Sequence, residues 1–281
     1  MYNSLTFDDF NNPKIAFYDA TNGDLRYANF TGGAWYFDVI DTNGDVGLYP
    51  SLAFELIGAN SNPHVSYYDA TNGDLKYAHW DGSQWVRQTV DSGGDVGQFT
   101  SLALTASNHP KITYYDVTNR DLKLAEWNGS NWSVYAIDTT GDVGKYSDMV
   151  LGNFDTPHIS YYDETNGNLN YLTYTTGWTK TVVDPVNDTG LYTGIALDEF
   201  NQPHISYYDA THADLRFAYR ASGNWTVQAV DTLGDVGRFT SLALDSDGTP
   251  HITYYDATNG DLKFASGLLA NRQIFLPLQP D

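Results

Sequence analysis

The chain has 281 residues, 35 acidic and 14 basic, which gives a formal net charge of −21 at pH 7. That charge argues against nucleic acid or an anionic membrane surface as partner and favours neutral or cationic ligands. The absence of cysteine excludes disulfides, thiolate metal sites and a cysteine nucleophile. No apolar run approaches the roughly 18 to 20 residues that cross a bilayer, and no leader segment opens the chain. We therefore expect no membrane insertion, and either a cytosolic protein or one whose signal peptide is absent from this chain.

A motif close to YDATNGDL recurs six times at intervals of 46 to 50 residues. Its leading aspartates are Asp19, Asp69, Asp116, Asp163, Asp209 and Asp256. A period of this length predicts a repeat architecture in which each unit is one small sheet. We expect a single domain over 1–281, with repeats at approximately 1–49, 50–99, 100–146, 147–192, 193–239 and 240–281.

The first repeat contains four short apolar runs, each bounded by Gly, Asn, Asp or Pro. The runs are Ser4–Phe7, Lys14–Tyr18, Leu25–Phe30 and Trp35–Ile40. Runs of this kind predict a four-stranded antiparallel meander, and no apolar stripe of helical period occurs. Six such repeats predict an all-β fold, a six-bladed β-propeller of four-stranded antiparallel blades.

Within each repeat, the first and the fourth strand have distinctive compositions. The small, apolar SLAL runs, which begin at Ser51, Ser101 and Ser241, suit the central channel where strands converge. The fourth strand begins with a tryptophan whose broad ring is expected to fill the wedge between sheets. These tryptophans are Trp85, Trp132, Trp178 and Trp225.

The last repeat departs from the pattern after Phe264. Residues 273–278 are a candidate for its outer strand. The alternative is that this tail packs elsewhere, in which case residues 1–7 need not form an inner strand.

The turn between the second and third strands, usually ATNG, has a physical logic. Asn and Gly tolerate a positive φ, and the flanking aspartates accept hydrogen bonds from turn amides. Arg120 stands at the glycine position in the third copy, and His212 and Ala213 replace Asn and Gly in the fifth. Either the turn tolerates an L-residue there, or those two turns differ.

The connectors between repeats, such as DTNGDVG, add further carboxylates to the end of the blades that carries these turns. Oxygen donors at this density are candidate ligands for Ca²⁺. The segment that best matches a metal site is Asp41, Asn43 and Asp45, although no bidentate Glu follows at the spacing of a calcium loop. The alternative is that these aspartates form turns by accepting hydrogen bonds.

A basic residue follows the proline at the start of every second strand. The set is Lys14, His64, Lys111, His158, His204 and His251, which we expect on the face opposite the aspartates. Imidazoles there suit metal binding or proton transfer. The alternative is that each packs on the neighbouring blade and caps a turn.

Aromatic side chains form the third candidate set. We predict ligand binding by the tyrosine that ends each second strand and by the aspartate that follows it. These residues are Tyr18, Asp19, Tyr68, Asp69, Tyr115, Asp116, Tyr162, Asp163, Tyr208, Asp209, Tyr255 and Asp256. A second group precedes the SLAL-type runs and comprises Tyr49, Phe99, Tyr146, Tyr192 and Phe239. A sugar stacks on a flat ring while its hydroxyls donate to a carboxylate, but core packing also explains aromatics at a repeated strand position.

The stretch YYDATNGDLKYAHWDGSQW resembles the repeats of the six-bladed fucose-binding propeller lectins of fungi and bacteria. The resemblance covers all six repeats and implies the propeller architecture and multivalent binding. In that family the sugar site uses an arginine of the second strand. Small residues match it here, namely Ala16, Ser66, Thr113, Ser160, Ser206 and Thr253, so the resemblance does not imply fucose recognition of that type.

The sequence favours a secreted or cell-surface protein that binds a glycan or an extracellular protein partner, with calcium as a candidate cofactor. One alternative is a polysaccharide lyase or hydrolase with its site at the central channel. Its candidate residues break the repeat symmetry: Glu55, Glu126, Asp148 and Glu164. A second alternative is a structural interaction module.

Overall fold

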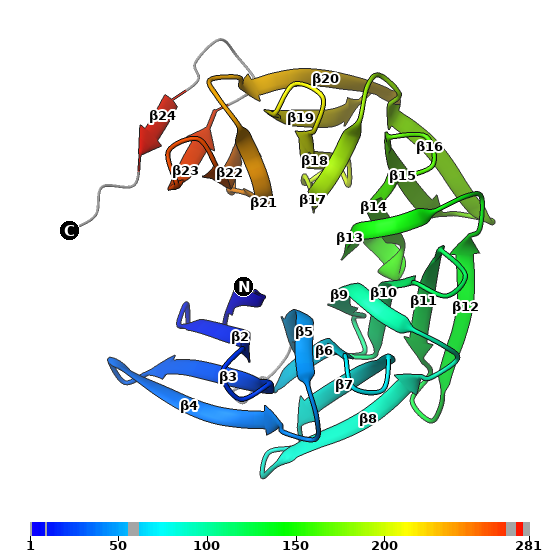
Figure 1. The fold of residues 1–281 in the computed structure, drawn as a ribbon, viewed down its shortest axis with the longest axis vertical. Coiled ribbons are helices and arrows are strands. Elements are labelled where there is room, and N and C mark those ends of the chain that lie inside the picture. Colours follow the sequence, from blue (N-terminus) through cyan, green and yellow to red (C-terminus); the bar gives the residue numbers. More distant parts are fainter. Residues whose placement is uncertain (1, 9, 56–61, 268–273, 278–281) are drawn as a thin grey trace. The chain divides into compact units, whose positions relative to one another are not determined.

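The computed structural model describes residues 2–8, 10–55, 62–267 and 274–277. Six antiparallel sheets, each made of four consecutive strands, confirm the prediction of an all-β, six-bladed β-propeller (Figure 1). The chain divides into two compact units of three sheets each, Met1–Thr140 (unit 1) and Gly141–Asp281 (unit 2). That 1–281 forms a single domain stays a prediction.

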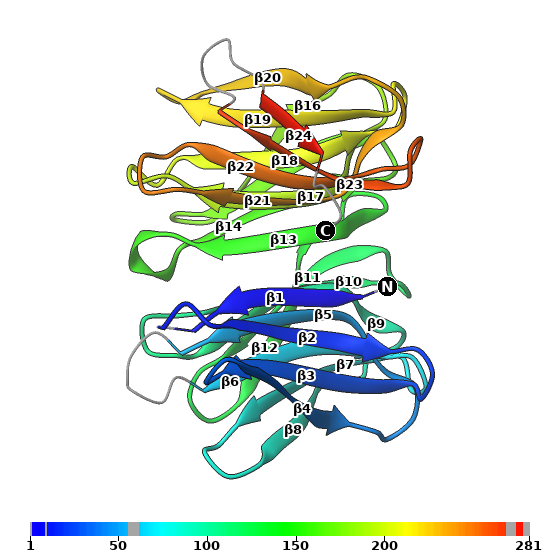
Figure 2. The same cartoon turned by 90° about the vertical axis from the view of Figure 1, so that its left-hand side faces the viewer.

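The strands of unit 1 follow one another across each sheet in chain order, as Figure 2 shows for β1 to β4. The first sheet holds β1 (Asn3–Phe7), β2 (Pro13–Asp19), β3 (Asp24–Thr31) and β4 (Ala34–Asp41). The second holds β5 (Val46–Phe54), β6 (Pro63–Asp69), β7 (Asp74–Trp80) and β8 (Trp85–Asp91). The third holds β9 (Val96–Leu104), β10 (Pro110–Asp116), β11 (Asp121–Trp127) and β12 (Trp132–Asp138).

Unit 2 repeats this arrangement and adds one 3₁₀ turn, Asn153–Asp155. Its first sheet holds β13 (Val143–Leu151), β14 (Pro157–Asp163), β15 (Asn168–Tyr174) and β16 (Trp178–Asp184). The next holds β17 (Thr189–Leu197), β18 (Pro203–Asp209), β19 (Asp214–Ala221) and β20 (Asn224–Asp231). The last holds β21 (Val236–Leu244), β22 (Pro250–Asp256), β23 (Asp261–Ser266) and β24 (Ile274–Pro277). No helix long and apolar enough to cross a membrane occurs in the described part of the chain.

The cores lie between neighbouring sheets of each unit. Every residue of β6, β14 and β18 is buried, because these second strands are covered on both faces. The tryptophan that opens the fourth strand packs its edge on a tyrosine of the preceding blade, with ring centres 5.4 Å apart for Tyr27 and Trp85. The predicted wedge role of these tryptophans is thereby confirmed for Trp85, Trp132 and Trp225.

The first strand of a blade is longer than predicted, since β5 begins at Val46 and not at Ser51. Its register with β6 shifts twice, once on each side of the Leu48 and Tyr68 pair. The two left-handed residues of these β-bulges are Gly47, with φ of 103°, and Tyr49, with φ of 50°. Bulges interrupt the alternation of side chains along a strand, and for this reason the sequence pattern does not assign the end of the GDVG segment to a strand.

The turns with Arg120 and Ala213 have the same conformation as the glycine-containing turns. Their φ values are 64° and 61°, against 74° for Gly23. The backbone N–H of Arg120 donates to the Asp116 carbonyl at 2.7 Å, as that of Gly73 does to the Asp69 carbonyl at 2.8 Å. The turn therefore tolerates an L-residue.

The first and last sheets are each continuous in sequence. β24 pairs with β23, which confirms the predicted outer strand over Ile274–Pro277, while residues 273 and 278 lie outside the described residues. β1 pairs with β2, and Ser4 Oγ accepts a hydrogen bond from the Leu52 N–H at 3.0 Å. The N-terminal segment is thus a true first strand, and within the described residues neither of these sheets includes a strand from elsewhere in the chain.

Candidate functional site at the connector end of the blades

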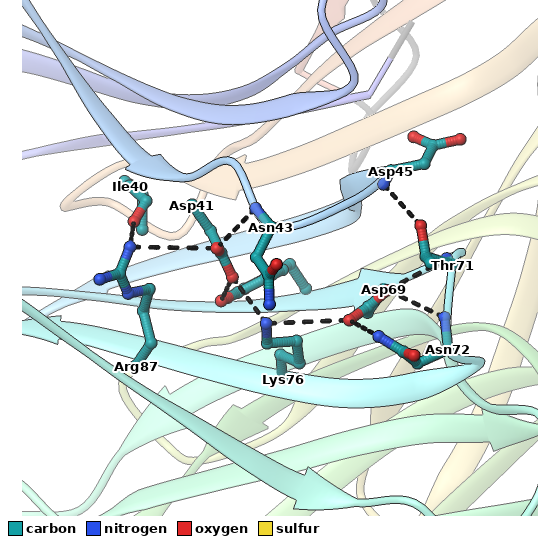
Figure 3. Close-up of polar contacts among 10 residues, drawn as sticks. Ile40, Asp41, Asn43, Asp45, Asp69, Thr71, Asn72, Lys76 and Arg87 are labelled. Atoms are coloured by element: carbon teal, nitrogen blue, oxygen red, sulfur yellow. Dashed lines mark hydrogen bonds and ion pairs between the residues drawn. The ribbon is translucent and has the colours of Figure 1, made fainter.

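The predicted meeting of turns and connectors at one end of the blades, here called the connector end, is confirmed within each unit. The connector after β4 binds the turns of two successive blades: the Val46 N–H donates to the Gly23 carbonyl at 2.9 Å, and the Ala70 N–H to the Asp45 carbonyl at 2.8 Å. The Asp45 N–H also donates to Thr71 Oγ1 at 2.7 Å. Figure 3 shows this contact. The same aspartate-to-threonine bond recurs at Asp95, Asp142, Asp188 and Asp235.

The first carboxylate of a connector, here called the inner carboxylate, lies between two blades of one unit at Asp41, Asp91, Asp184 and Asp231. Asp41 is 2% exposed and accepts hydrogen bonds from Tyr67 and Lys76 of the next blade, both at 2.7 Å (Figure 3). Burial raises the pKa of Asp41, but the hydrogen bonds from Lys76 and Tyr67 outweigh it and hold that pKa below its ordinary value. The inner carboxylate is therefore a charged link between blades.

The same link recurs at three more connectors with a lysine or an arginine as the cation. The sets are Asp91 with Tyr114 and Lys123, Asp184 with Tyr207 and Arg216, and Asp231 with Tyr254 and Lys263. Their carboxylate-to-cation distances are 2.6, 3.2 and 3.1 Å.

The aspartates of the predicted Tyr-Asp pairs serve their own turns. Asp69 accepts hydrogen bonds from the Thr71 N–H and from the backbone and side chain of Asn72 at 2.9 to 3.1 Å. Equivalent turn contacts are made by Asp19, Asp116, Asp163, Asp209 and Asp256. All of the six except Asp19 are at most 2% exposed. A ligand contact through these aspartates stays a prediction.

The tyrosines of those pairs bond to a different carboxylate, the last aspartate of the connector, here called the outer carboxylate. The pairs are Tyr18–Asp45, Tyr68–Asp95, Tyr162–Asp188 and Tyr208–Asp235, at 2.6 to 2.9 Å. Successive side chains on a strand point to opposite faces, so a tyrosine and the aspartate after it do not face the same side. That alternation was the signal in the sequence that could have separated them.

The remaining two predicted tyrosines differ in exposure. Tyr115 is buried and its ring lies 6.3 Å from that of Phe99, whereas Tyr255, on β22, is 38% exposed.

The predicted calcium segment does not bring its three oxygen donors to one point. Asp41 accepts hydrogen bonds from Lys76 and Tyr67, and the Asp45 carboxylate points away from Asp41 (Figure 3). Asp45 instead accepts the Tyr18 hydroxyl at 2.7 Å. Asn43 contributes its backbone N–H to Asp41 at 3.2 Å. No cluster of three or more His, Cys, Asp or Glu arranged for a metal ion occurs among the described residues. Calcium at this segment stays a prediction.

The aromatics that precede the SLAL-type runs form what we call the aromatic rim: Tyr49, Phe99, Tyr146, Tyr192 and Phe239. All five adopt a left-handed backbone, with φ between 50° and 54°. In unit 1 the ring centres of Tyr2 and Tyr49 lie 4.5 Å apart, and those of Tyr49 and Phe99 4.6 Å. In unit 2 the corresponding distances are 4.6 Å for Tyr146–Tyr192 and 4.4 Å for Tyr192–Phe239. The rings of each unit thus form a continuous row.

Four of the five rim rings contact a tyrosine of a second strand, and three of these tyrosines donate a hydrogen bond to an outer carboxylate. The rim-to-tyrosine ring distances are 6.3 Å for Tyr49–Tyr68, for Phe99–Tyr115 and for Tyr146–Tyr162, and 6.1 Å for Tyr192–Tyr208. Tyr68, Tyr162 and Tyr208 then donate to Asp95, Asp188 and Asp235. A half-buried ring, a hydroxyl and a carboxylate therefore occur together in both units.

The basic set lies at the other end of the second strands, as predicted, and we call this the histidine end. His64 bonds to the Tyr77 hydroxyl through Nδ1 and lies 3.4 Å from Glu55 through Nε2. His158 bonds to the Tyr171 hydroxyl at 2.5 Å, and desolvation lowers its pKa to about 4. The other members pair with carboxylates: Lys14 with Asp8, Lys111 with Glu126, His204 with Asp198 and His251 with Asp245. These contacts agree with the capping alternative, and a role of this set in metal binding or proton transfer stays a prediction.

The four carboxylates that break the repeat symmetry are each engaged with other groups. Asp148 accepts the Ile195 N–H at 2.9 Å, the role that Ser51 plays for Leu102. The other three contact basic residues: Glu55 with His64, Glu126 with Lys111, and Glu164 with Lys145.

The positions that match the lectin arginine lie inside the contacts between blades. Ser66 Oγ bonds to Thr100 Oγ1 of the next blade at 2.8 Å, and Ser160 Oγ to Thr193 Oγ1 at 2.9 Å. Both serines are fully buried. A sugar site built from the matching strand position is therefore absent from these blades.

Solved structures similar to this chain are also propellers. The fucose-specific lectin from Aleuria aurantia has a TM-score of 0.60 at 14% identity, over 98% of this chain and 94% of the lectin. A Hadza microbial sialidase has a TM-score of 0.61 at 14% identity, over 95% of this chain and 65% of the sialidase chain. An ulvan lyase, which is a polysaccharide lyase, has a TM-score of 0.56 at 16% identity, over 91% of this chain and 74% of the lyase chain. No protein-family model matches the sequence, and no curated protein does. At these identities the likeness shows the fold.

Proposed function

We propose that this protein binds glycans through the aromatic rim at the connector end. The observation that carries the proposal is the left-handed backbone of five aromatic residues. A bulky side chain at positive φ is a backbone outlier, and such outliers cluster at ligand-binding and catalytic sites. Glycine is the residue that fits this conformation without strain.

The neighbouring bulge of the same strand provides an internal reference. It uses glycine in the five repeats after the first, at Gly47, Gly97, Gly144, Gly190 and Gly237. A Cβ at Gly47 would lie 2.7 Å from the Leu25 Cβ, so close packing requires glycine there. An L-residue in the left-handed region costs about 1–2 kcal/mol. Five rings kept at that cost, two residues from positions that use glycine, indicate a role for the rings themselves.

The chemistry around the rim suits a sugar. The apolar face of a pyranose stacks on an aromatic ring, and sugar hydroxyls donate to carboxylates such as Asp95 and Asp188. Tyr68 and Tyr162 hold these carboxylates in place by donating to them at 2.8 and 2.6 Å. This adjacency of ring and fixed carboxylate supports recognition of carbohydrate.

The spacing of the rim favours an extended ligand. Neighbouring ring centres are only 4.4 to 4.6 Å apart, which is less than the width of a pyranose with its hydroxyls. Adjacent rings therefore share one sugar chain more readily than they hold separate monosaccharides. We expect oligosaccharides to bind more tightly than their monomers.

The structural neighbours agree with this class of ligand. By their names, the lectin is specific for fucose, the sialidase acts on sialic acid, and the ulvan lyase acts on a polysaccharide. A glycan ligand in turn supports a secreted or cell-surface location.

A glycan array, run with and without calcium, tests the proposal. We expect binding to one family of oligosaccharides, and a calcium requirement would support a metal at the connectors. The double variant Tyr49→Gly and Phe99→Gly should lose at least tenfold in affinity. Tyr174→Ser, which removes an exposed ring at the histidine end, is the matched control and should bind normally. Silence of the wild-type protein under both conditions would contradict the proposal.

A further inference from the structure

The residue that precedes each rim aromatic differs between repeats and decides the charge beside the outer carboxylate. The five residues are Leu48, Gln98, Lys145, Leu191 and Arg238. Each lies three residues after its outer carboxylate, so the five repeats place different side chains at the same position beside that carboxylate. Two of the five are cationic and three are neutral.

Arg238 shows what the site does with a cation. Its guanidinium contacts both oxygens of Asp235, at 3.0 and 2.5 Å, and lies 5.5 Å from the centre of the Tyr208 ring. Arginine on a carboxylate and over an aromatic face combines a charge-assisted fork with a cation–π contact. Lys145 lies 3.4 Å from Asp142 and also contacts Glu164.

The other three outer carboxylates, Asp45, Asp95 and Asp188, have no ion pair with Lys, Arg or His in the described ranges of the chain. Each accepts a tyrosine hydroxyl, which adds no positive charge. The inner carboxylates differ, because Asp41, Asp91 and Asp184 each have a cation within 3.2 Å. Among these six carboxylates, the ones without a cationic partner are therefore the outer carboxylates beside Leu48, Gln98 and Leu191.

We infer that Asp45, Asp95 and Asp188 bind protonated amines of the ligand, in the place that the Arg238 guanidinium takes on Asp235. Resting on the proposed function, this inference names the ligand class as cationic glycans, that is, polymers of amino sugars. The rim rings stack the sugar while the outer carboxylate holds its ammonium group. Asp45 is exposed and Asp95 and Asp188 are half-buried, whereas Tyr68 and Tyr162 are largely covered, so the carboxylate is the accessible partner.

The charge of the whole chain agrees with this class. At −21 the protein attracts cations and repels uronic or sulfated glycans over a distance set by the ionic strength. Binding of an amino-sugar polymer should therefore weaken as salt is added.

The experiment compares two hexamers that share one sugar backbone, glucosamine hexamer with its ammonium groups and N-acetylglucosamine hexamer with neutral acetamide groups, titrated calorimetrically at a pH below the amine's pKa. We expect the glucosamine hexamer to bind at least tenfold more tightly. Equal or tighter binding of the acetylated hexamer would overturn the inference and leave glycan binding in place. Binding of neither hexamer, with a silent array, would overturn both. Hexalysine binding with no glycan binding would also overturn both and would indicate a peptide ligand.

Variants at the neutral positions sharpen the test, because they supply or remove the internal cation. The double variant Gln98→Arg and Leu191→Arg should weaken the glucosamine hexamer about tenfold, since each arginine occupies a carboxylate. The double variant Gln98→Met and Leu191→Met is the neutral control and should bind as the wild type does. Arg238→Leu should strengthen binding by exposing Asp235. Unchanged affinity in both the arginine and the leucine variants would overturn the inference.

Discussion

The two ends of the blades use polar side chains differently. At the connector end the same inner set of aspartate, tyrosine and lysine or arginine recurs from blade to blade, as with Asp41, Tyr67 and Lys76. At the histidine end the basic residue changes its partner at almost every repeat, from Asp8 for Lys14 to the Tyr77 hydroxyl for His64. The difference teaches that repetition by itself does not mark a ligand site. At the connector end the most regular polar contacts are those of the inner carboxylates, which link blades. The positions that vary between repeats lie beside the outer carboxylates.

The largest difference between the two ends should appear when one cation is removed. Lys76→Met removes the nearer cation of the buried Asp41, leaves Arg87 at 3.9 Å, and should cost about 3 kcal/mol in unfolding free energy. Lys111→Met at the histidine end should cost about 1 kcal/mol, because Lys111 and Glu126 are 17% and 30% exposed. Urea unfolding of the two variants measures both values. Equal losses would refute the distinction between the ends.

A pH series separates the ends by titration. Because His158 has a pKa of about 4 in the folded protein and about 6.5 when unfolded, the stability it contributes is complete above pH 6.5 and lost as the pH falls to 4. In His158→Gln, the unfolding free energy should lose on the order of 1–3 kcal/mol less than the wild type does as the pH falls over that range. The pKa of Asp41 and Asp91 is lowered, so their stabilisation is lost only below about pH 4. A wild-type slope unchanged by His158→Gln would contradict this assignment.

The smallest effect concerns the turns of the connector end. Ala213 has φ of 61° in the turn that elsewhere contains glycine, so Ala213→Gly should raise the unfolding free energy by about 1 kcal/mol. Gly73→Ala is the reverse control and should lower it by a similar amount. Thermal unfolding of the two variants, read side by side, checks both signs. A loss of stability in Ala213→Gly would show that the turn is not strained.

The sequence alone could predict the six sheets because turn residues bound every strand and the period is regular. The tyrosine partners could not be found by adjacency, since Tyr68 reaches Asp95 in the following connector and turns away from Asp69. The rim conformation was also hidden. The residues around Tyr49 read as an ordinary approach to a strand, and only the register of β5 with β6 reveals the two bulges. Hydrogen bonds between distant residues and the sign of the φ angle are the features that local composition does not encode.

The most direct test of the account measures folding and binding together in the rim-to-glycine variant Tyr49→Gly and Phe99→Gly. Release of backbone strain, about 1–2 kcal/mol per residue, should offset part of the loss of four ring pairs, each worth about 0.5–1.5 kcal/mol beyond its buried area. We predict a loss of about 1–4 kcal/mol in unfolding free energy and a loss of glycan affinity of at least tenfold. A fall of several kcal/mol in stability with unchanged glycan affinity would show that the rings serve the core and would contradict the account.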